Sequence, residues 1–213
     1  MQPVDLPRLY PILDTASLEE RNCLVETAAA AMLAGGASLL QLRHKGAWSR
    51  AMLEVAEHLR DLCRRLGAGF IVDDRADVAL LLDAGVHVGQ DDLAPADARR
   101  LIGPQRWLGF STHNADQLRA AATEPADYLA LGPIFETGSK QKPDPVVGLE
   151  GLRAWRPLTP RPLVAIGGIT RSNARAVLEA GADSVAVIGD LLPTPCTAHS
   201  LRERMEEWQQ LLR

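Results

Sequence analysis

The chain has 213 residues, of which 46% are apolar and 23% charged, a composition that is typical of globular proteins and excludes a disordered chain. Its 23 Lys and Arg residues against 27 Asp and Glu residues give a net charge of −4, which argues against nucleic acid or an anionic membrane as a partner. Cys23, Cys63 and Cys196 form no CxxC metal motif and no disulfide framework, so we expect a cytoplasmic protein. We expect neither a signal peptide nor a membrane span, and the composition leaves open whether the chain forms a homo-oligomer.

Short apolar runs alternate with longer amphipathic patterns from one end of the chain to the other. The expected strands are residues 9–14, 38–43, 70–74, 86–89, 107–112, 128–135, 163–168 and 184–189. The clearest expected helices are residues 18–33, 50–66, 115–122, 171–180 and 201–212. Most strand runs are continuously apolar, which is typical of parallel sheets buried on both faces. The pattern predicts a single α/β domain over residues 1–213 that forms a (β/α)8 TIM barrel, with an open doubly wound sheet as the alternative.

Polar residues lie at and just after the end of the second expected strand. Gln41, Arg43 and Lys45 lie on one side of the chain, because side chains alternate along an extended segment. An amide and two cations placed together suit an anionic substrate. The alternative is a charged strand end that faces solvent.

Carboxylates end the third expected strand, at Asp73 and Asp74, and follow the fourth, at Asp91 and Asp92. Adjacent strand ends can bring such groups to one Mg²⁺ ion, which takes one or two carboxylates and completes its shell with water and phosphate oxygens. Surface pairs and helix caps are the alternatives, and Asp92 in particular suits the start of the next helix.

Further candidates follow the later strands. Ser111 and His113 end the fifth strand, where His113 suits a general base or the segment caps a helix. The long irregular segment after the sixth expected strand, residues 136–147, offers hydroxyls and a cation, which suit either an anion site or a polar surface loop. Gly167, Gly168 and Gly189 suit phosphate binding through backbone amides, unless they only form tight turns.

Six stretches at expected strand ends stand out in chain order: residues 41–45, 72–75, 87–92, 109–113, 132–140 and 165–169. Together they resemble the thiamine phosphate synthase family. Members of the family join an aminomethylpyrimidine diphosphate to a thiazole monophosphate, or to its carboxylated precursor, and release diphosphate. The resemblance implies a dissociative reaction that is assisted by Mg²⁺ and needs no protein nucleophile.

The resemblance also implies roles for individual positions. Asp74 and Asp92 would bind Mg²⁺, and Arg43, Lys45, Ser111 and Lys140 would be catalytic. The pyrimidine diphosphate would contact Gln41, Leu42, Arg43, His44, Lys45, Asp73, Ser111 and Lys140. The thiazole phosphate would contact Thr137, Gly138, Ser139, Gly168, Ile188 and Gly189.

This chain departs from the family pattern at three of these positions. Asp73 stands where the family usually has Asn, Ser139 where it commonly has Thr, and Gly189 where it usually has Ser. Asp73 adds a negative charge beside the expected diphosphate. We expect it either to contact the Mg²⁺ ion or to pair with Arg75 or a cation of the second strand, and its position next to Asp74 favours the metal.

Two other functions remain as alternatives. A thiazole tautomerase on the same barrel would use His113 and the segment 135–137, although it would have no use for the paired carboxylates. A non-catalytic sensor would keep the phosphate pocket without turnover.

Overall fold

The computed structural model describes residues 6–137 and 144–213. Within these residues eight parallel strands pair in sequence order, and β1 also pairs with β8, so the sheet closes into a barrel. Closure confirms the TIM barrel and excludes the open sheet. The strands are β1 (Leu9–Asp14), β2 (Leu39–Arg43), β3 (Gly69–Asp73), β4 (Gly85–Val88), β5 (Leu108–Thr112), β6 (Tyr128–Leu131), β7 (Leu163–Ile166) and β8 (Ser184–Val187).

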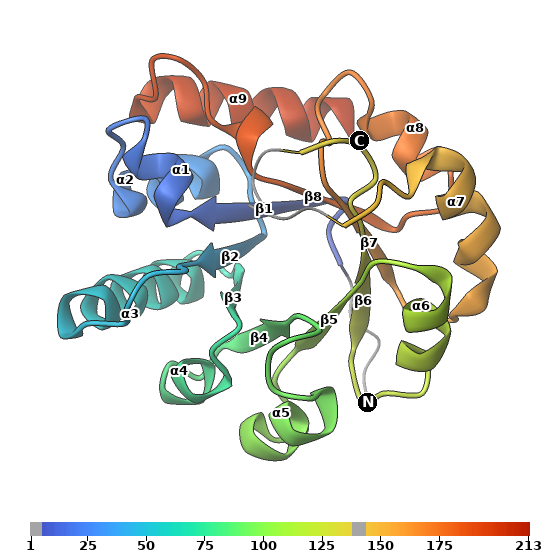
Figure 1. Ribbon diagram of the computed structural model, residues 1–213. Coiled ribbons are helices and arrows are strands. Elements are labelled where there is room, and N and C mark those ends of the chain that lie inside the picture. Colours follow the sequence, from blue (N-terminus) through green and yellow to red (C-terminus); the bar gives the residue numbers. More distant parts are fainter. Residues whose placement is uncertain (1–5, 138–143) are drawn as a thin grey trace.

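Helices surround this barrel, as Figure 1 shows. The last helix packs against the second, so the first and last units of the barrel are neighbours. In the described parts of the chain, no helix has the length and apolar character that crossing a bilayer requires. The helices are α1 (Thr15–Glu19), α2 (Val25–Ala34), α3 (Arg50–Arg65), α4 (Ala76–Leu81), α5 (Pro95–Ile102), α6 (Ala115–Ala121), α7 (Gly148–Trp155), α8 (Ala174–Glu179) and α9 (Ala198–Leu211), with 3-10 turns η1 (Arg156–Leu158) and η2 (Gly189–Leu191).

Several predicted boundaries were wrong. The helix expected over residues 18–33 is two helices, because Asn22 has a φ of 51° and this left-handed conformation ends a helix. The strand expected to reach residue 135 ends at Leu131, since Pro133 lacks the N–H that a sheet needs. The strand expected to reach residue 168 ends at Ile166, because Gly167 has a φ of 102° and leaves the extended conformation.

Alternate side chains of the strands build two separate cores. Residues such as Leu13, Leu42 and Val72 point outward and pack under the helices. Those on the opposite face fill the inside of the barrel. Because both faces are buried, each strand reads as a continuous apolar run, as predicted. The inner core consists of Tyr10, Ile12, Leu39, Ile71, Tyr128, Ala130, Val164 and Ala186.

Candidate active site

The strands' carboxyl-terminal ends surround a cavity of about 560 Å³. This is the face on which TIM barrels carry their active sites. Residues from every strand contribute to its wall. Among them are Tyr10, Gln41, Asp73, His87, Ser111, Tyr128, Val164 and Ala186.

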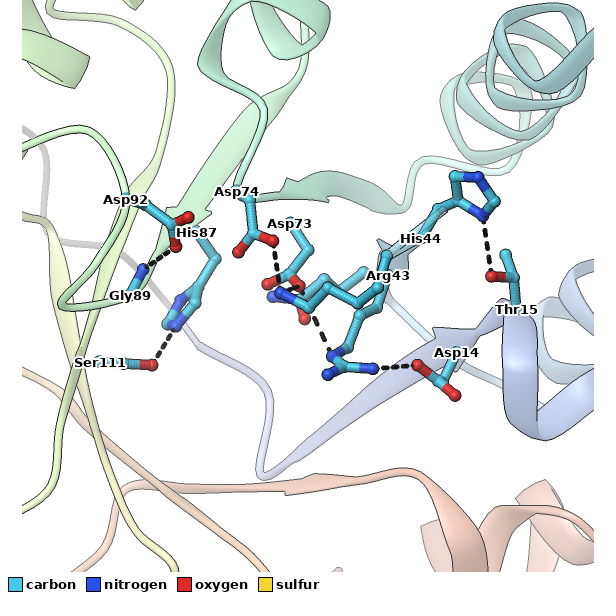
Figure 2. Close-up of polar contacts among 12 residues, drawn as sticks. Asp14, Thr15, Arg43, His44, Asp73, Asp74, His87, Gly89, Asp92 and Ser111 are labelled. Atoms are coloured by element: carbon cyan, nitrogen blue, oxygen red, sulfur yellow. Dashed lines mark hydrogen bonds and ion pairs between the residues drawn. The ribbon is translucent and has the colours of Figure 1, made fainter. Parts of the chain in front are cut away.

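The β2 strand end contributes the cations of the cavity. Gln41, Arg43 and Lys45 all line it, as the alternation of side chains predicted. The Arg43 guanidinium binds the carboxylate of Asp14 at the end of β1 (Figure 2). Although burial acts to raise it, hydrogen bonds from Ser17 and the Arg43 ion pair hold the pKa of Asp14 below its ordinary value. Asp14 therefore anchors Arg43 in an ionised pair.

The other two residues of this segment do not bring their side chains to the cavity. Leu42 is fully buried in the outer core, beneath the helices. His44 lies 2.9 Å, through Nδ1, from the Thr15 hydroxyl at the start of α1. Figure 2 shows His44 directed away from Asp73 and Asp74.

Asp73 is buried among the β2 cations. Its Oδ2 atom lies 2.9 Å from the Lys45 ammonium and 3.6 Å from Arg43 Nε. Burial raises the pKa of Asp73 although Lys45 and Arg43 oppose the shift. Arg75, one of the partners considered, instead pairs with Asp77 at 2.5 Å. These contacts favour pairing with the β2 cations over a metal contact.

Lys45 connects the two carboxylates that end β3. Its ammonium contacts Asp74 as well as Asp73. Burial acts to lower the pKa of Lys45, but the two carboxylates outweigh it and raise the pKa. Lys45 is therefore firmly cationic, with its side chain 48% exposed toward the cavity mouth.

Asp74 and Asp92 come together although 18 positions separate them in the chain. Asp74 has a φ of 63°, and its N–H donates to the His87 carbonyl of β4 at 2.7 Å, so the chain turns sharply after β3. The Asp92 carboxylate accepts the Gly89 N–H at 2.7 Å. Burial and the neighbouring Asp74 carboxylate raise the pKa of Asp92 against the effect of that N–H. With water or substrate oxygens, these two carboxylates could hold a divalent cation.

Asp92 does not cap the next helix, contrary to the alternative considered for it. Helix α5 starts at Pro95, after Ala94, and Asp92 lies on the loop before it. Within residues 6–137 and 144–213, no group of three or more His, Cys, Asp or Glu side chains is arranged to hold a metal. A metal here would therefore need ligands from water or substrate besides this pair, as Mg²⁺ commonly does.

Ser111 is held by a buried histidine that sequence reasoning did not assign to the site. His87 Nε2 lies 2.8 Å from the Ser111 hydroxyl (Figure 2). Burial lowers the pKa of His87 to about 4, so this ring is neutral at physiological pH. The only sequence signal for His87 was a histidine in an otherwise apolar strand. The sequence does not show that its ring lies inside the barrel beside Ser111.

His113 lines the cavity but is tied to the backbone. Its Nδ1 atom lies 2.7 Å from the Gly132 carbonyl oxygen and 3.6 Å from Asp144 Oδ2. Helix α6 is capped by Asn114, which accepts the Gln117 N–H at 2.9 Å. The capping alternative for this segment is confirmed for Asn114.

The opposite wall of the cavity carries the predicted phosphate residues. Thr137, Gly168, Ile188 and Gly189 line it, whereas Gly138, Ser139 and Lys140 lie outside the described residues. Gly168 has a φ of 63°, and a Cβ at this position would lie 2.4 Å from the Glu136 carbonyl oxygen. Only glycine therefore allows the β7 loop to pass this close to the loop after β6.

Asp190 adjoins this wall and is neutralised by a residue that the sequence did not single out. Arg171 Nε lies 3.0 Å from Asp190 Oδ2, and its guanidinium also contacts Glu207 of α9. The Asp190 charge is thereby compensated beside the predicted phosphate position. Nothing in the spacing of these two residues signalled the pair.

The sequence model of the family described as thiamine monophosphate synthase matches residues 9–191, which include all eight strands. The chain belongs to this family. It is 50% identical over 212 residues to the thiamine-phosphate synthase of Koribacter versatilis, covering 97% of this chain and 96% of the relative. Identity to the thiamine-phosphate synthase of Chloroflexus aurantiacus is 49% over 184 residues, or 85% of this chain and 83% of the relative.

A solved structure agrees with these relatives. The thiamine phosphate pyrophosphorylase from Pyrococcus furiosus is 38% identical and superimposes with a TM-score of 0.81 over 96% of this chain and 95% of its own. The resemblance to thiamine phosphate synthases is confirmed. The chain is a transferase of thiamine biosynthesis, and its relatives carry the synthase activity rather than the tautomerase considered as an alternative.

Proposed function

We propose that the enzyme joins an aminomethylpyrimidine diphosphate to a thiazole monophosphate and releases diphosphate and thiamine phosphate. The observation that carries this proposal is the charge arrangement around Lys45. Its ammonium and the Arg43 guanidinium lie on one side of the cavity, and the Asp74–Asp92 pair lies next to them. Cations beside a carboxylate pair suit a diphosphate bound together with a divalent ion.

The reaction needs charge stabilisation more than proton transfer. The bond between the pyrimidine methylene carbon and the diphosphate oxygen breaks, and its electron pair leaves with diphosphate. The aminopyrimidine ring stabilises the resulting methylene cation, to which the thiazole nitrogen lone pair forms the new C–N bond. No proton moves and no protein nucleophile is required. This fits a cavity whose buried histidine, His87, is neutral.

The facing carboxylates of Asp74 and Asp92 fit Mg²⁺, and we propose it as the cofactor. Two acidic groups close enough to raise one pKa gain from a cation between them. When bound, Mg²⁺ would neutralise charge on the departing diphosphate. Arg43 and Lys45 would bind the same diphosphate from the β2 side. Ser111 would contact this substrate as well.

The thiazole phosphate would bind on the β7–β8 side of the cavity. Gly168, Ile188 and Gly189 line this wall together with Thr137 from the loop after β6. Exposed backbone N–H groups in glycine-containing loops are suited to a phosphate, and TIM barrels often bind phosphate after their seventh and eighth strands. The two substrates would then meet above the inner core.

A coupled assay tests this function. Incubation with both substrates and Mg²⁺ should yield thiamine phosphate and diphosphate in equal amounts, and excess chelator should abolish the reaction. Isomerisation of the thiazole compound alone would indicate the tautomerase. Calorimetric binding of both substrates without product would indicate the sensor. Either result would contradict the proposed synthesis.

Asp73→Asn is expected to leave the Mg²⁺ dependence unchanged and to lower the KM for the pyrimidine diphosphate, by up to about tenfold or 1.4 kcal/mol. Asp73 lies 2.9 Å from Lys45, and removing its charge frees that cation for the diphosphate. Mg²⁺ titrations and steady-state kinetics of both proteins measure the effect. A variant that needs more Mg²⁺ and recovers at high Mg²⁺ would show instead that Asp73 contacts the metal.

Gly189→Ser is expected to lower the KM for the thiazole monophosphate, roughly two- to tenfold for one added hydrogen bond. A Cβ at Gly189 meets no heavy atom within 4 Å, and its φ lies outside the left-handed region. The matched control is Gly168→Ser. Its Cβ would lie 2.4 Å from the Glu136 carbonyl oxygen, so activity should fall. A higher KM of Gly189→Ser for the thiazole monophosphate would contradict the proposed phosphate position.

A further inference from the structure

A chain of buried hydrogen bonds crosses the inside of the barrel and ends at Ser111. Gln41 Nε2 donates to the Tyr10 hydroxyl at 3.0 Å, and the hydroxyls of Tyr10 and Tyr128 lie 2.7 Å apart. The Tyr128 hydroxyl lies 3.1 Å from His87 Nδ1, and His87 Nε2 lies 2.8 Å from the Ser111 hydroxyl. Five strands therefore contribute to one continuous chain.

With the amide nitrogen of Gln41 directed at the Tyr10 hydroxyl, the protons of this chain can run in one direction only. The Tyr10 hydroxyl accepts from Gln41 and has a single proton of its own. If Tyr128 donated to Tyr10, the proton of the Tyr10 hydroxyl itself would need another acceptor. None lies within hydrogen-bond distance in the described parts of the chain. A buried hydroxyl without an acceptor is costly. Tyr10 therefore donates to Tyr128.

The same reasoning fixes the next two bonds. Tyr128 accepts from Tyr10, so its own proton goes to His87 Nδ1. Both ring nitrogens of His87 face neutral hydroxyls in a buried position, which favours the neutral ring with one donor and one acceptor. With Nδ1 accepting, the ring proton lies on Nε2 and is donated to Ser111. The Ser111 hydroxyl accepts this bond and can donate its own proton to another group.

We propose that this chain sets Ser111 as a hydrogen-bond donor into the cavity, with Tyr128 and His87 as positioning residues. The donated bond goes to an acceptor atom of the pyrimidine diphosphate, so this inference rests on the proposed function. In the opposite direction the Ser111 proton would go to His87, and the hydroxyl would face the anionic substrate with lone pairs alone. The direction of the chain thus decides whether Ser111 attracts or repels an acceptor.

Gly109 gives the chain room to cross β5. Strand β5 lies between β4 and β6, yet His87 of β4 and Tyr128 of β6 contact each other. A Cβ at Gly109 would lie 2.3 Å from His87 Nδ1 and 2.4 Å from the Tyr128 hydroxyl. Any side chain here would displace the atoms of this hydrogen bond. The contact therefore depends on a glycine at this one position, in addition to the two rings.

Nitrogen-15 NMR of the histidine-labelled full-length protein tests the direction. The signals of His87 are assigned by their loss in His87→Asn. We expect a pyrrole-type Nε2 and a pyridine-type Nδ1 in the parent protein, and loss of this preference in Tyr128→Phe and in Gly109→Ala. A proton on Nδ1 in the parent would overturn the proposal. Because this readout needs no substrate, it stands even if the proposed synthesis fails.

A double-mutant cycle tests whether Tyr128 acts through Ser111. Tyr128→Phe should lower kcat/KM for the pyrimidine diphosphate roughly two- to tenfold, the value of one hydrogen bond. In the Ser111→Ala background the same change should alter kcat/KM by less than about twofold. An equal loss in both backgrounds would overturn the proposal. Ser184→Ala is the matched control, since it removes a buried strand hydroxyl outside the cavity and should leave kcat/KM unchanged.

Discussion

Replacing Asp92 or Asp74 by alanine is expected to lower kcat/KM at least about 100-fold, the usual cost of losing a strong electrostatic contact with a transition state. Each substitution removes one carboxylate of the pair that suits Mg²⁺. No third acidic or histidine ligand joins this pair among the described residues, so one remaining carboxylate would hold the ion poorly. Steady-state rates over a range of Mg²⁺ concentrations measure the loss, which should be only partly recovered at high Mg²⁺.

Asp77→Ala is the control for both carboxylates. Asp77 lies close by on α4, but its side chain is 58% exposed and pairs with Arg75 outside the cavity. Its removal should leave the Mg²⁺ titration unchanged. Near-parent rates for Asp74→Ala and Asp92→Ala, or full activity of the parent in excess chelator, would show that this pair holds no essential metal.

Lys45→Ala is expected to lower kcat/KM about 10²–10³-fold, as for the loss of one preorganised donor in an active site. The loss has two parts. The departing diphosphate loses a cation, and Asp73 and Asp74 lose the ammonium that compensates them. Two uncompensated carboxylates would repel the diphosphate. Steady-state kinetics with the pyrimidine diphosphate varied would show the fall in kcat/KM.

A second substitution separates these two parts. Asp73→Asn in the Lys45→Ala background should recover several-fold of the lost activity, because it removes one of the repelling charges. Arg75→Ala is the control, since this cation lies nearby but pairs with Asp77 and does not line the cavity. If Lys45→Ala and Arg75→Ala had the same small effect, Lys45 would have no special role toward the diphosphate.

Much of the fold could be predicted because it is encoded locally. A parallel strand buried on both faces must be apolar throughout, so the eight runs mark eight strands. Helix ends were harder. Asn22 divides the expected helix over residues 18–33, and nothing in the apolar pattern required that break. An amphipathic stretch predicts burial of one face but not whether one or two helices bury it.

The candidate site was predictable where it follows the ends of strands. Gln41, Arg43 and Lys45 reach the cavity because side chains alternate along β2. Asp74 and Asp92 meet because β3 and β4 are neighbours in the barrel. The same rule places Leu42 under the helices, where its side chain does not line the cavity.

By itself, the sequence determined the barrel, its family and the strand ends that supply charge, since these depend on the period and order of residues along the chain. Only the tertiary structure decided which charges are compensated. From the sequence, Lys45 could pair with Asp73, with Asp74 or Asp92, or with the substrate. The fold places its ammonium against Asp73 and Asp74. Tyr10 and Tyr128 are 118 positions apart, and their contact depends on closure of β1 onto β8. Such pairings follow from the register of the whole barrel, which no local pattern specifies.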